Sequence, residues 1–327
     1  MSMKGWFYAQ MEGIVQALEQ LGTDDFIFWY EATTPIATAP GLPTIDLTKK
    51  YGEDRVRYSG LDEMWYAGAT LGAALVGSIA IDWHDMYMAN PYPFEIVSQH
   101  AAKLHHMTGG QATIPAVWVI HISGQGPGLA GQHSDYEADS WYAHVPGVRT
   151  VIPSTVYDAK GLMITAVKSK DPFVYLNGSA FRALSDDIPD TPYEVPIGKA
   201  AVRTRGSDLT IVSSGQGMLA AMEGAQKLQG DGISVETIDL RCLNPMDTET
   251  LVKSAKKTGR VLTVDQSKYT LCPGAEVIAR IAEFTDGVKF KRIAFPDAPP
   301  PGAPEMFNYM KPNGTHVYEA AKALLRK

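Results

Sequence analysis

The chain has 327 residues, of which 45% are hydrophobic and 20% are charged, and its formal net charge at pH 7 is -7. This length allows two domains with cores of their own, and the negative balance argues against a nucleic-acid-binding protein, which needs a basic face. No stretch reaches the roughly 18 consecutive apolar residues that a membrane span requires, so we expect no membrane association. Two cysteines are too few for a disulfide framework or a zinc site, which favours the reducing cytoplasm.

The first half of the chain alternates apolar strands with helices. The pattern predicts helices over residues 4–21, 63–77, 96–106 and 157–168, and strands over residues 25–30, 78–83, 116–122, 148–152 and 173–176. Such alternation is typical of a doubly wound, mostly parallel α/β sheet. Residues 184–197 then carry three prolines and four acids, a composition that indicates a linker.

The same pattern restarts after this segment. It predicts strands over residues 209–212, 235–238, 261–264 and 289–295, and helices over residues 218–228, 247–257, 274–284 and from His316 onward. We therefore predict two α/β domains, residues 1–183 and 198–327, joined by the linker at residues 184–197.

A lone acid opens the helix predicted over residues 63–77, EMWYAGATLGAALVG. Most of its other residues are small, so neighbouring elements can approach the helix closely and draw the Glu63 carboxylate out of water. Burial raises the pKa of a carboxyl group, which suits an acid that shares a proton with a bound heterocycle. The alternative is an N-terminal acid that only complements the helix dipole.

Two glycine-rich segments lack the context of a nucleotide site. Gly230-Asp231-Gly232 lies between a helix and a strand, and Asn244 follows too closely for a metal-diphosphate motif. Residues 124–128 follow a strand but contain a proline and open no helix, so they are no dinucleotide fingerprint. His133, just beyond, is either a ligand-facing imidazole that titrates near neutral pH or an incidental loop residue.

The order of several longer motifs resembles one family. These are HHMTGGQATIP (105–115), GQHSDYEADSWYAHVPGVRTVIPSTVYDAKGL (131–162), DPFVYL (171–176), VETIDLRCLNPMD (235–247), KKTGRVLTVDQ (256–266), GAEVIARIAE (274–283) and PDAPPPGAP (296–304). Over essentially its whole length the sequence resembles the beta subunit of the thiamine-diphosphate-dependent 2-oxoacid dehydrogenases of the pyruvate, branched-chain and acetoin types. The resemblance implies a thiamine-diphosphate pyrimidine-binding domain followed by a transketolase C-terminal-like domain.

This resemblance assigns catalytic roles to two residues. Glu63 matches the family's glutamate that hydrogen-bonds the aminopyrimidine ring and so activates the cofactor, and His133 matches the histidine that faces substrate. The positions that match cofactor contacts are Glu31, Glu63, Trp83, His84 and Tyr87.

A potassium site is also implied by the resemblance. The turn at residues 166–171 matches a loop that holds a structural potassium ion through backbone carbonyls, and the implied ligands are Ala166, Val167, Ser169 and Asp171. The alternative is an ordinary helix-to-strand turn.

The family also accounts for the missing diphosphate motif. In it, a separate alpha subunit carries that motif and holds most of the Mg²⁺ coordination, so the resemblance implies an alpha2-beta2 heterotetramer in which this chain is inactive alone. The implied reaction cleaves the C–C bond next to a carbonyl of a 2-oxoacid or acyloin, a small molecule. The acyl fragment then passes to an acceptor, which is the lipoyl group of an acyltransferase partner, another aldehyde or ketone, or water.

Departures from the family pattern gather around the expected site. Asp62 adds a carboxylate beside Glu63, His84 and Asp85 replace smaller or apolar residues, and the segment after His133 is one residue longer. We interpret them as altered substrate choice. The alternatives are a carboligase or split transketolase-like enzyme without a lipoyl carrier, and a non-catalytic scaffold subunit, while the lack of a fingerprint disfavours a nicotinamide dehydrogenase.

Overall fold

The computed structural model describes residues 1–30, 44–60, 62–84, 91–122 and 138–326. The chain divides into two compact units, Met1–Gly124 with Trp141–Ile197, and Gln125–Ser140 with Gly198–Lys327. Each unit has a mostly parallel sheet covered by helices, which confirms the predicted fold class.

The first unit contains most of the elements that surround the predicted site. Its strands are β1 (Ser2–Gly5), β2 (Phe26–Tyr30), β3 (Val56–Tyr58), β4 (Ile79–Trp83), β5 (Ala116–Ile122), β6 (Arg149–Val151), β7 (Phe173–Gly178) and β8 (Ser185–Ile188). Its helices are α1 (Trp6–Leu21), α2 (Leu47–Tyr51), α3 (Glu63–Leu75), α4 (Pro91–Glu95), the π-helical turn Ile96–Ala101, α5 (Ala102–Met107), α7 (Val156–Val167) and the 3-10 turn Ser179–Ala183. Helix α6 (Ala138–Ala143) spans the division between the units.

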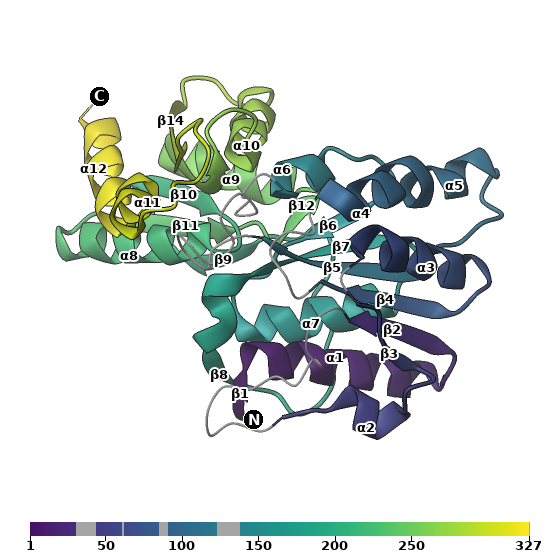
Figure 1. The fold of residues 1–327 in the computed structure, drawn as a ribbon. Coiled ribbons are helices and arrows are strands. Elements are labelled where there is room, and N and C mark those ends of the chain that lie inside the picture. The colour runs from purple at the N-terminus through teal and green to yellow at the C-terminus, as the bar shows by residue number, and fades with distance from the viewer. Residues whose placement is uncertain (31–43, 61, 85–90, 123–137, 327) are drawn as a thin grey trace. The chain divides into compact units, whose positions relative to one another are not determined.

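Six parallel strands run in the order β6-β7-β5-β4-β2-β3. Helices α1 and α7 pack together on one face of this sheet, and α3, α4 and α5 cover the other (Figure 1). Because the strands are parallel, the carboxyl ends of β2, β4 and β5 meet at one edge, where open α/β sheets bind their ligands. Helix α3 precedes β4 in the chain, and β4 ends at this edge.

The segment predicted as a linker packs against the first unit. Strand β8 pairs antiparallel with β1, with Ser2 opposite Ile188. The Lys160 ammonium, which is fully buried, donates to the carbonyl oxygens of Pro189 at 2.8 Å and Thr191 at 3.2 Å. Buried Val195 then packs on Gly161 of α7. Residues 184–197 are therefore held along their length by side chains of the unit that precedes them.

The second unit has a smaller sheet in the order β14-β13-β10-β11-β9, with only β9 antiparallel. Its strands are β9 (Ala201–Thr204), β10 (Leu209–Ser213), β11 (Val235–Asp239), β12 (Cys242–Asn244), β13 (Arg260–Lys268) and β14 (Lys289–Phe295). Its helices are α8 (Gly217–Gly230), α9 (Thr248–Thr258), α10 (Pro273–Ala282), α11 (Pro304–Met310) and α12 (Gly314–Leu325). Its core lies between α8, α12 and strands β10 and β13.

Several helices begin at residues whose side chains satisfy free backbone N–H groups. Asp62 accepts from the N–H of Trp65 at α3, Thr155 from Asp158 at α7, and Asp247 from Thr250 at α9. Such caps set where a helix starts, so the position of Glu63 at the first residue of α3 follows from Asp62.

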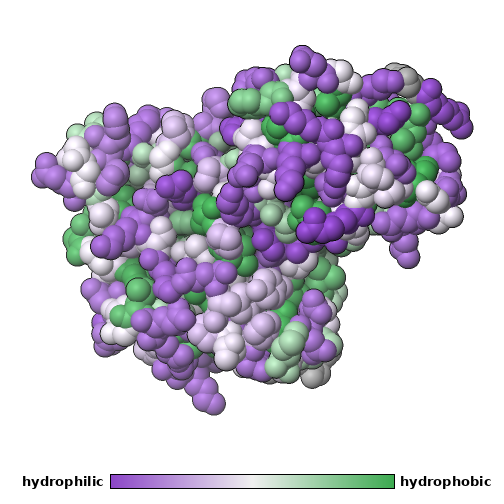
Figure 2. All heavy atoms as spheres, turned by 180° about the vertical axis from the view of Figure 1, so that it is seen from behind, coloured by the Kyte–Doolittle hydropathy of each residue, from purple (hydrophilic) through white to green (hydrophobic). Residues whose placement is uncertain are grey.

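When the molecule is seen from behind, hydrophobic residues form separate patches among hydrophilic ones on its surface (Figure 2).

Candidate active site at the start of helix α3

Glu63 is the first residue of α3, and its side chain is half-buried. The preceding Asp62 is exposed and its carboxylate accepts from the N–H of Trp65 at 3.1 Å. Asp62 therefore caps the helix, and Glu63 is the residue directly after this cap. Two residues after Glu63 in the same turn, Trp65 packs edge to face on Trp29 of β2, with ring centroids 5.1 Å apart.

Three fully buried polar side chains lie behind this first turn. The Tyr66 hydroxyl is 2.9 Å from His84 Nδ1, and His84 Nε2 is 2.9 Å from Asp82 Oδ2. Tyr66 and His84 Nδ1 therefore share one hydrogen, and Nε2 of the same ring faces the Asp82 carboxylate. Tyr66 follows Glu63 by three residues, so both project from one face of α3.

The pKa of the Asp82 carboxyl responds to both His84 and Glu63. Burial raises the pKa of the Asp82 carboxyl, while the neighbouring His84 opposes the rise and the charge of Glu63 adds to it. A buried carboxyl group costs free energy unless it is paired, and His84 is the partner that offsets this cost. The charge of Glu63 thus disfavours ionisation of Asp82.

A second buried network lies on the other face of β4. Asn177 Nδ2 donates to His121 Nε2 at 2.9 Å, so His121 carries its proton on Nδ1 and donates it to the carbonyl oxygen of His84. The amide oxygen of Asn177 accepts from Trp6 Nε1 at 2.6 Å and from Gln10 at 3.3 Å. This network ties α1 to β5 and β7, and it contacts the first one at the carbonyl oxygen of His84.

Side chains alternate across a strand, and this separates two predicted cofactor contacts. Trp83 is 1% exposed and packs against Phe28 and Phe7, on the α1 side of the sheet. His84 lies on the α3 side, with Tyr66 and Asp82. The structure therefore brings Glu63 and His84 into one region and places the Trp83 indole in the core behind them. Glu31, Tyr87 and His133 lie outside the described residues.

The turn predicted to hold potassium is closed by hydrogen bonds of its own. The Ser169 N–H donates to the Ala166 carbonyl oxygen at 3.1 Å, and the Asp171 N–H donates to Ser169 Oγ at 3.0 Å. Both Nε and Nη2 of Arg149 donate to one carboxylate oxygen of Asp171. Val167 is buried at the end of α7. The potassium site stays a prediction.

Sequence reasoning missed Tyr66 and Asp82 as site residues. The usable signal was the spacing, because Asp82 precedes His84 by two residues in an otherwise apolar strand and therefore shares its face. A polar pair on one face of a buried strand requires a partner, and Tyr66 supplies it from α3.

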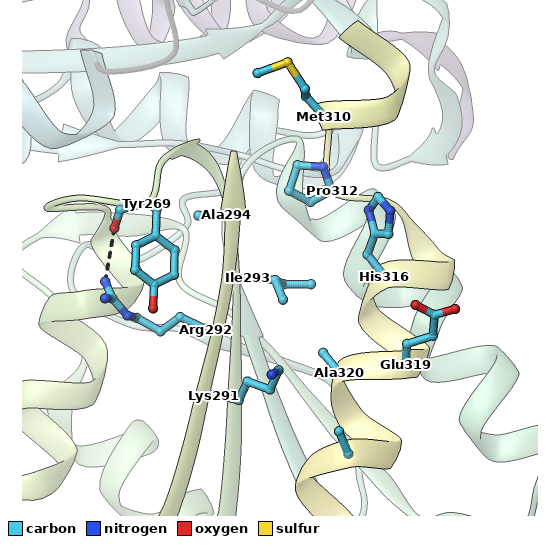
Figure 3. Close-up of a pocket in the computed structure, with 11 residues that line it drawn as sticks. Tyr269, Lys291, Arg292, Ile293, Ala294, Met310, Pro312, His316, Glu319 and Ala320 are labelled. Carbon is cyan, nitrogen blue, oxygen red and sulfur yellow. Dashed lines mark hydrogen bonds between the residues drawn. The ribbon is translucent and has the colours of Figure 1, made fainter. Parts of the chain in front are cut away.

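A separate cavity of about 490 Å³ lies in the second unit between β14 and α12 (Figure 3). Its wall carries Lys291, Arg292, His316 and Glu319, and Arg292 Nη1 donates to the Tyr269 carbonyl oxygen at 3.1 Å. None of the predicted site residues lines this cavity.

Within the described ranges, no group of three or more His, Cys, Asp or Glu side chains is arranged to hold a metal ion. In the same part of the chain, no helix has the length and apolar content needed to cross a bilayer.

Comparisons with known proteins match both units. Residues 32–177 match the transketolase pyrimidine binding domain, and residues 198–317 match the transketolase C-terminal domain. The chain is 35% identical over 289 residues to the pyruvate dehydrogenase E1 component subunit beta of Rhizobium meliloti, a match that covers 87% of this chain and 62% of that protein. It is 36% identical over 289 residues to the 2-oxoisovalerate dehydrogenase subunit beta of Bacillus subtilis, covering 86% of this chain and 87% of that one.

A solved structure described as a split gene transketolase, inactive beta4 tetramer, superposes with a TM-score of 0.78. The match covers 97% of this chain and 98% of that chain at 20% identity, so it bears on the fold alone.

Proposed function

Because this chain belongs to the family of beta subunits of the thiamine-diphosphate-dependent 2-oxoacid dehydrogenases, we propose that it cleaves, together with an alpha subunit, the C–C bond next to a carbonyl of a 2-oxoacid or acyloin. The observation that carries the proposal is the half-buried carboxyl group of Glu63, at the capped start of α3 beside a buried set of polar groups. The reaction needs such a group to exchange a proton with the cofactor.

The residues at this place fit the aminopyrimidine end of thiamine diphosphate. Glu63 presents a carboxyl group that can exchange a hydrogen with a ring nitrogen, and its helix is fixed by the cap and by the Trp65–Trp29 contact. When bound, the cofactor supplies the nucleophilic thiazolium carbon that attacks the substrate carbonyl. The roles of this chain are to hold a proton at the carboxyl group of Glu63 and, through His133, to hydrogen-bond or protonate groups on the substrate side.

The described residues suit a site that is shared with a second chain. No cluster able to hold a metal is present among them, and we propose that an alpha subunit binds Mg²⁺ and the diphosphate. Helix α3 and the residue after it expose large apolar side chains, namely Met64, Trp65, Leu75 and Val76, at 46% to 83% exposure. Exposed apolar groups gathered on one element are typical of an interface, and we propose that they contact partner chains in an alpha2-beta2 heterotetramer.

The proposal also covers the acceptor of the acyl fragment, the potassium site and the cellular compartment. We propose a lipoyl group on an acyltransferase as acceptor, with an aldehyde or ketone acceptor as the outcome if no lipoyl protein serves. The carbonyls of the turn at residues 166–171 would hold the potassium ion. Both cysteines are free and buried, as thiols in a reducing cytoplasm would be.

The test uses this chain co-expressed with its alpha-type partner and saturated with thiamine diphosphate and Mg²⁺. Its readout is the rate at which the hydrogen on the thiazolium carbon of the bound cofactor exchanges for deuterium, which requires no knowledge of the substrate. We expect the Glu63→Ala substitution to slow this exchange by about 100-fold or more, because it removes the group that holds the proton.

Calorimetric titration of the cofactor provides the control. The unmodified complex and the Glu63→Ala complex should both bind thiamine diphosphate, and this chain alone should bind it weakly. An exchange rate that is unchanged in Glu63→Ala would contradict a catalytic role and leave a scaffold subunit.

A further inference from the structure

His84 follows β4 directly, and its side chain is fully buried. Its two ring nitrogens lie 2.9 Å from the Tyr66 hydroxyl and 2.9 Å from Asp82 Oδ2. An imidazole in this position does not offer an exposed face to a cofactor. It connects a helix to a strand, and whatever it does for the reaction it does through these two neighbours.

The helix side of this connection is the turn that begins with Glu63. Three contacts hold that turn: the Asp62 cap on the Trp65 N–H, the Trp65 ring on Trp29, and the Tyr66 hydroxyl on His84. The first two act on the outer side of the turn, where Asp62 and Trp65 are exposed. The Tyr66 hydrogen bond acts on the buried side, on the face that Tyr66 shares with Glu63.

The strand side is equally well held. The His84 ring is oriented by Asp82, two residues back on the same face of β4, and the His84 carbonyl oxygen accepts from His121 on the opposite face. The partner of Tyr66 is thus held by the Asp82 carboxylate on one face of the sheet and by His121 on the other. A hydrogen bond to such an anchored partner limits both rotation of α3 about its axis and fraying of its first turn.

We propose that Tyr66, His84 and Asp82 are positioning residues that hold the Glu63 carboxyl group in the direction needed to share its proton with the cofactor. The inference rests on the function proposed above for Glu63. A displacement of about 1 Å at a reacting group can cost on the order of 100-fold in rate, so an anchor on this turn has a measurable effect on the chemistry. Neither Tyr66 nor Asp82 needs to touch the cofactor for this to hold.

The experiment again measures deuterium exchange at the thiazolium carbon in the alpha–beta complex saturated with thiamine diphosphate and Mg²⁺. Tyr66→Phe removes only the hydroxyl and keeps the ring in place, and His84→Gln keeps a polar side chain of similar length. We expect each to slow the exchange by about tenfold. The double variant should be no slower than the single variants, because all three lose the same hydrogen bond.

A matched control is Tyr175→Phe. The Tyr175 hydroxyl is also fully buried and donates to a backbone carbonyl, that of Ala159, at 2.9 Å, but it lies on β7 and makes no contact with α3 among its hydrogen bonds in the described residues. We expect this variant to lose comparable thermal stability and to keep the exchange rate within twofold. Hydrogen exchange of the backbone amides in the first turn of α3 should accelerate in Tyr66→Phe and remain unchanged in Tyr175→Phe.

The results of these variants test the positioning role and the proposed function separately. If Glu63→Ala slows the exchange while Tyr66→Phe and His84→Gln do not, the positioning role is wrong and the proposed function stands. If Tyr175→Phe slows it as much as Tyr66→Phe, general destabilisation explains the effect and the positioning role is also wrong. If Glu63→Ala itself has no effect, the proposed function fails, and the positioning role fails with it.

Discussion

Asp265 is a buried carboxyl group at the end of β13, in the second unit. Burial raises its pKa to about 7, and the negative charge of Asp139 adds to the rise. The N–H of Gly274, in the first turn of α10, donates to Asp265 Oδ1 at 3.1 Å. The folded protein therefore keeps a proton on Asp265 at pH values where the unfolded chain, with a carboxyl pKa near 3.8, has lost it.

This difference predicts a pH dependence of stability. Between pH 4 and 7 the folded state binds more protons than the unfolded state, so the contribution of Asp265 to the free energy of unfolding falls as pH rises, by on the order of 4 kcal/mol in total. Asn has no proton to lose and keeps the oxygen that accepts from Gly274. We expect Asp265→Asn to gain stability relative to the parent as pH rises, as measured by urea denaturation at pH 5 and 8. Equal differences at both pH values would contradict the raised pKa.

Single residues also show what sequence patterns can and cannot reveal about the site. Glu63 could be identified because a lone acid at a helix start stands out among small residues. The partnership of Tyr66, His84 and Asp82 could not, because it depends on which face of β4 each side chain takes and on the register between α3 and β4. The burial of Asp82 could not be predicted either, because it results from the packing of α3 on β4 and not from the local sequence.

Helix α7 and the segment after β8 make a contact that an added methyl group would disturb. A Cβ on Gly161 would lie 2.5 Å from Val195 Cγ2 and 2.9 Å from Tyr193 Cε2. Helix propensity favours Ala over Gly by about 1 kcal/mol, whereas overpacking costs about 1–3 kcal/mol. Because the Val195 atom must move, we expect Gly161→Ala to lose about 1 kcal/mol of stability in chemical denaturation, after the gain in helix propensity is subtracted.

The matched control is Gly72→Ala in α3, where a Cβ meets nothing within 4 Å. Propensity alone should then act, and this variant should gain up to about 1 kcal/mol. A gain in Gly161→Ala as well would mean that residues 184–197 do not pack on α7. Limited proteolysis within that segment should accelerate in Gly161→Ala only.

Elements with a long apolar period were predictable, and short paired strands were not. The predicted helix over residues 157–168 and strand over residues 116–122 match α7 and β5 to within one residue. Strands β1 and β8 escaped prediction because each exists only through pairing with the other, across more than 180 residues of chain. Prolines and acids in residues 184–197 therefore indicated a linker, although long-range contacts hold that segment in place.

At the scale of the whole molecule, the exposed apolar residues of α3 and its end predict how the chain assembles. Val76 follows the helix directly and is 83% exposed. If this surface contacts a partner, a charge placed there must be desolvated on association. We expect Val76→Glu to weaken the complex with the alpha-type chain by about tenfold or more in sedimentation velocity, with no loss of stability in the isolated chain.

Leu21→Glu serves as the comparison, because Leu21 is 42% exposed at the end of α1, on the other side of the sheet. Similar weakening by both substitutions would argue that charge in general, and not the α3 surface, affects assembly. Partner chains could be inferred from the family resemblance only, because apolar side chains on a helix predict burial without saying what covers them.

The backbone and the side chain of His84 belong to two different hydrogen-bond networks, one on each face of the sheet. Replacing this residue alone would remove the side chain that Tyr66 and Asp82 share and keep the carbonyl oxygen that accepts from His121, whereas changing the side chains at positions 66, 82 and 84 together can preserve the geometry of the first network. Libraries intended to alter the substrate range of such an enzyme should therefore vary these three positions jointly. Randomising them one at a time would leave each new side chain facing the two old partners, and would miss combinations in which a new trio holds the same carboxyl group at a different angle.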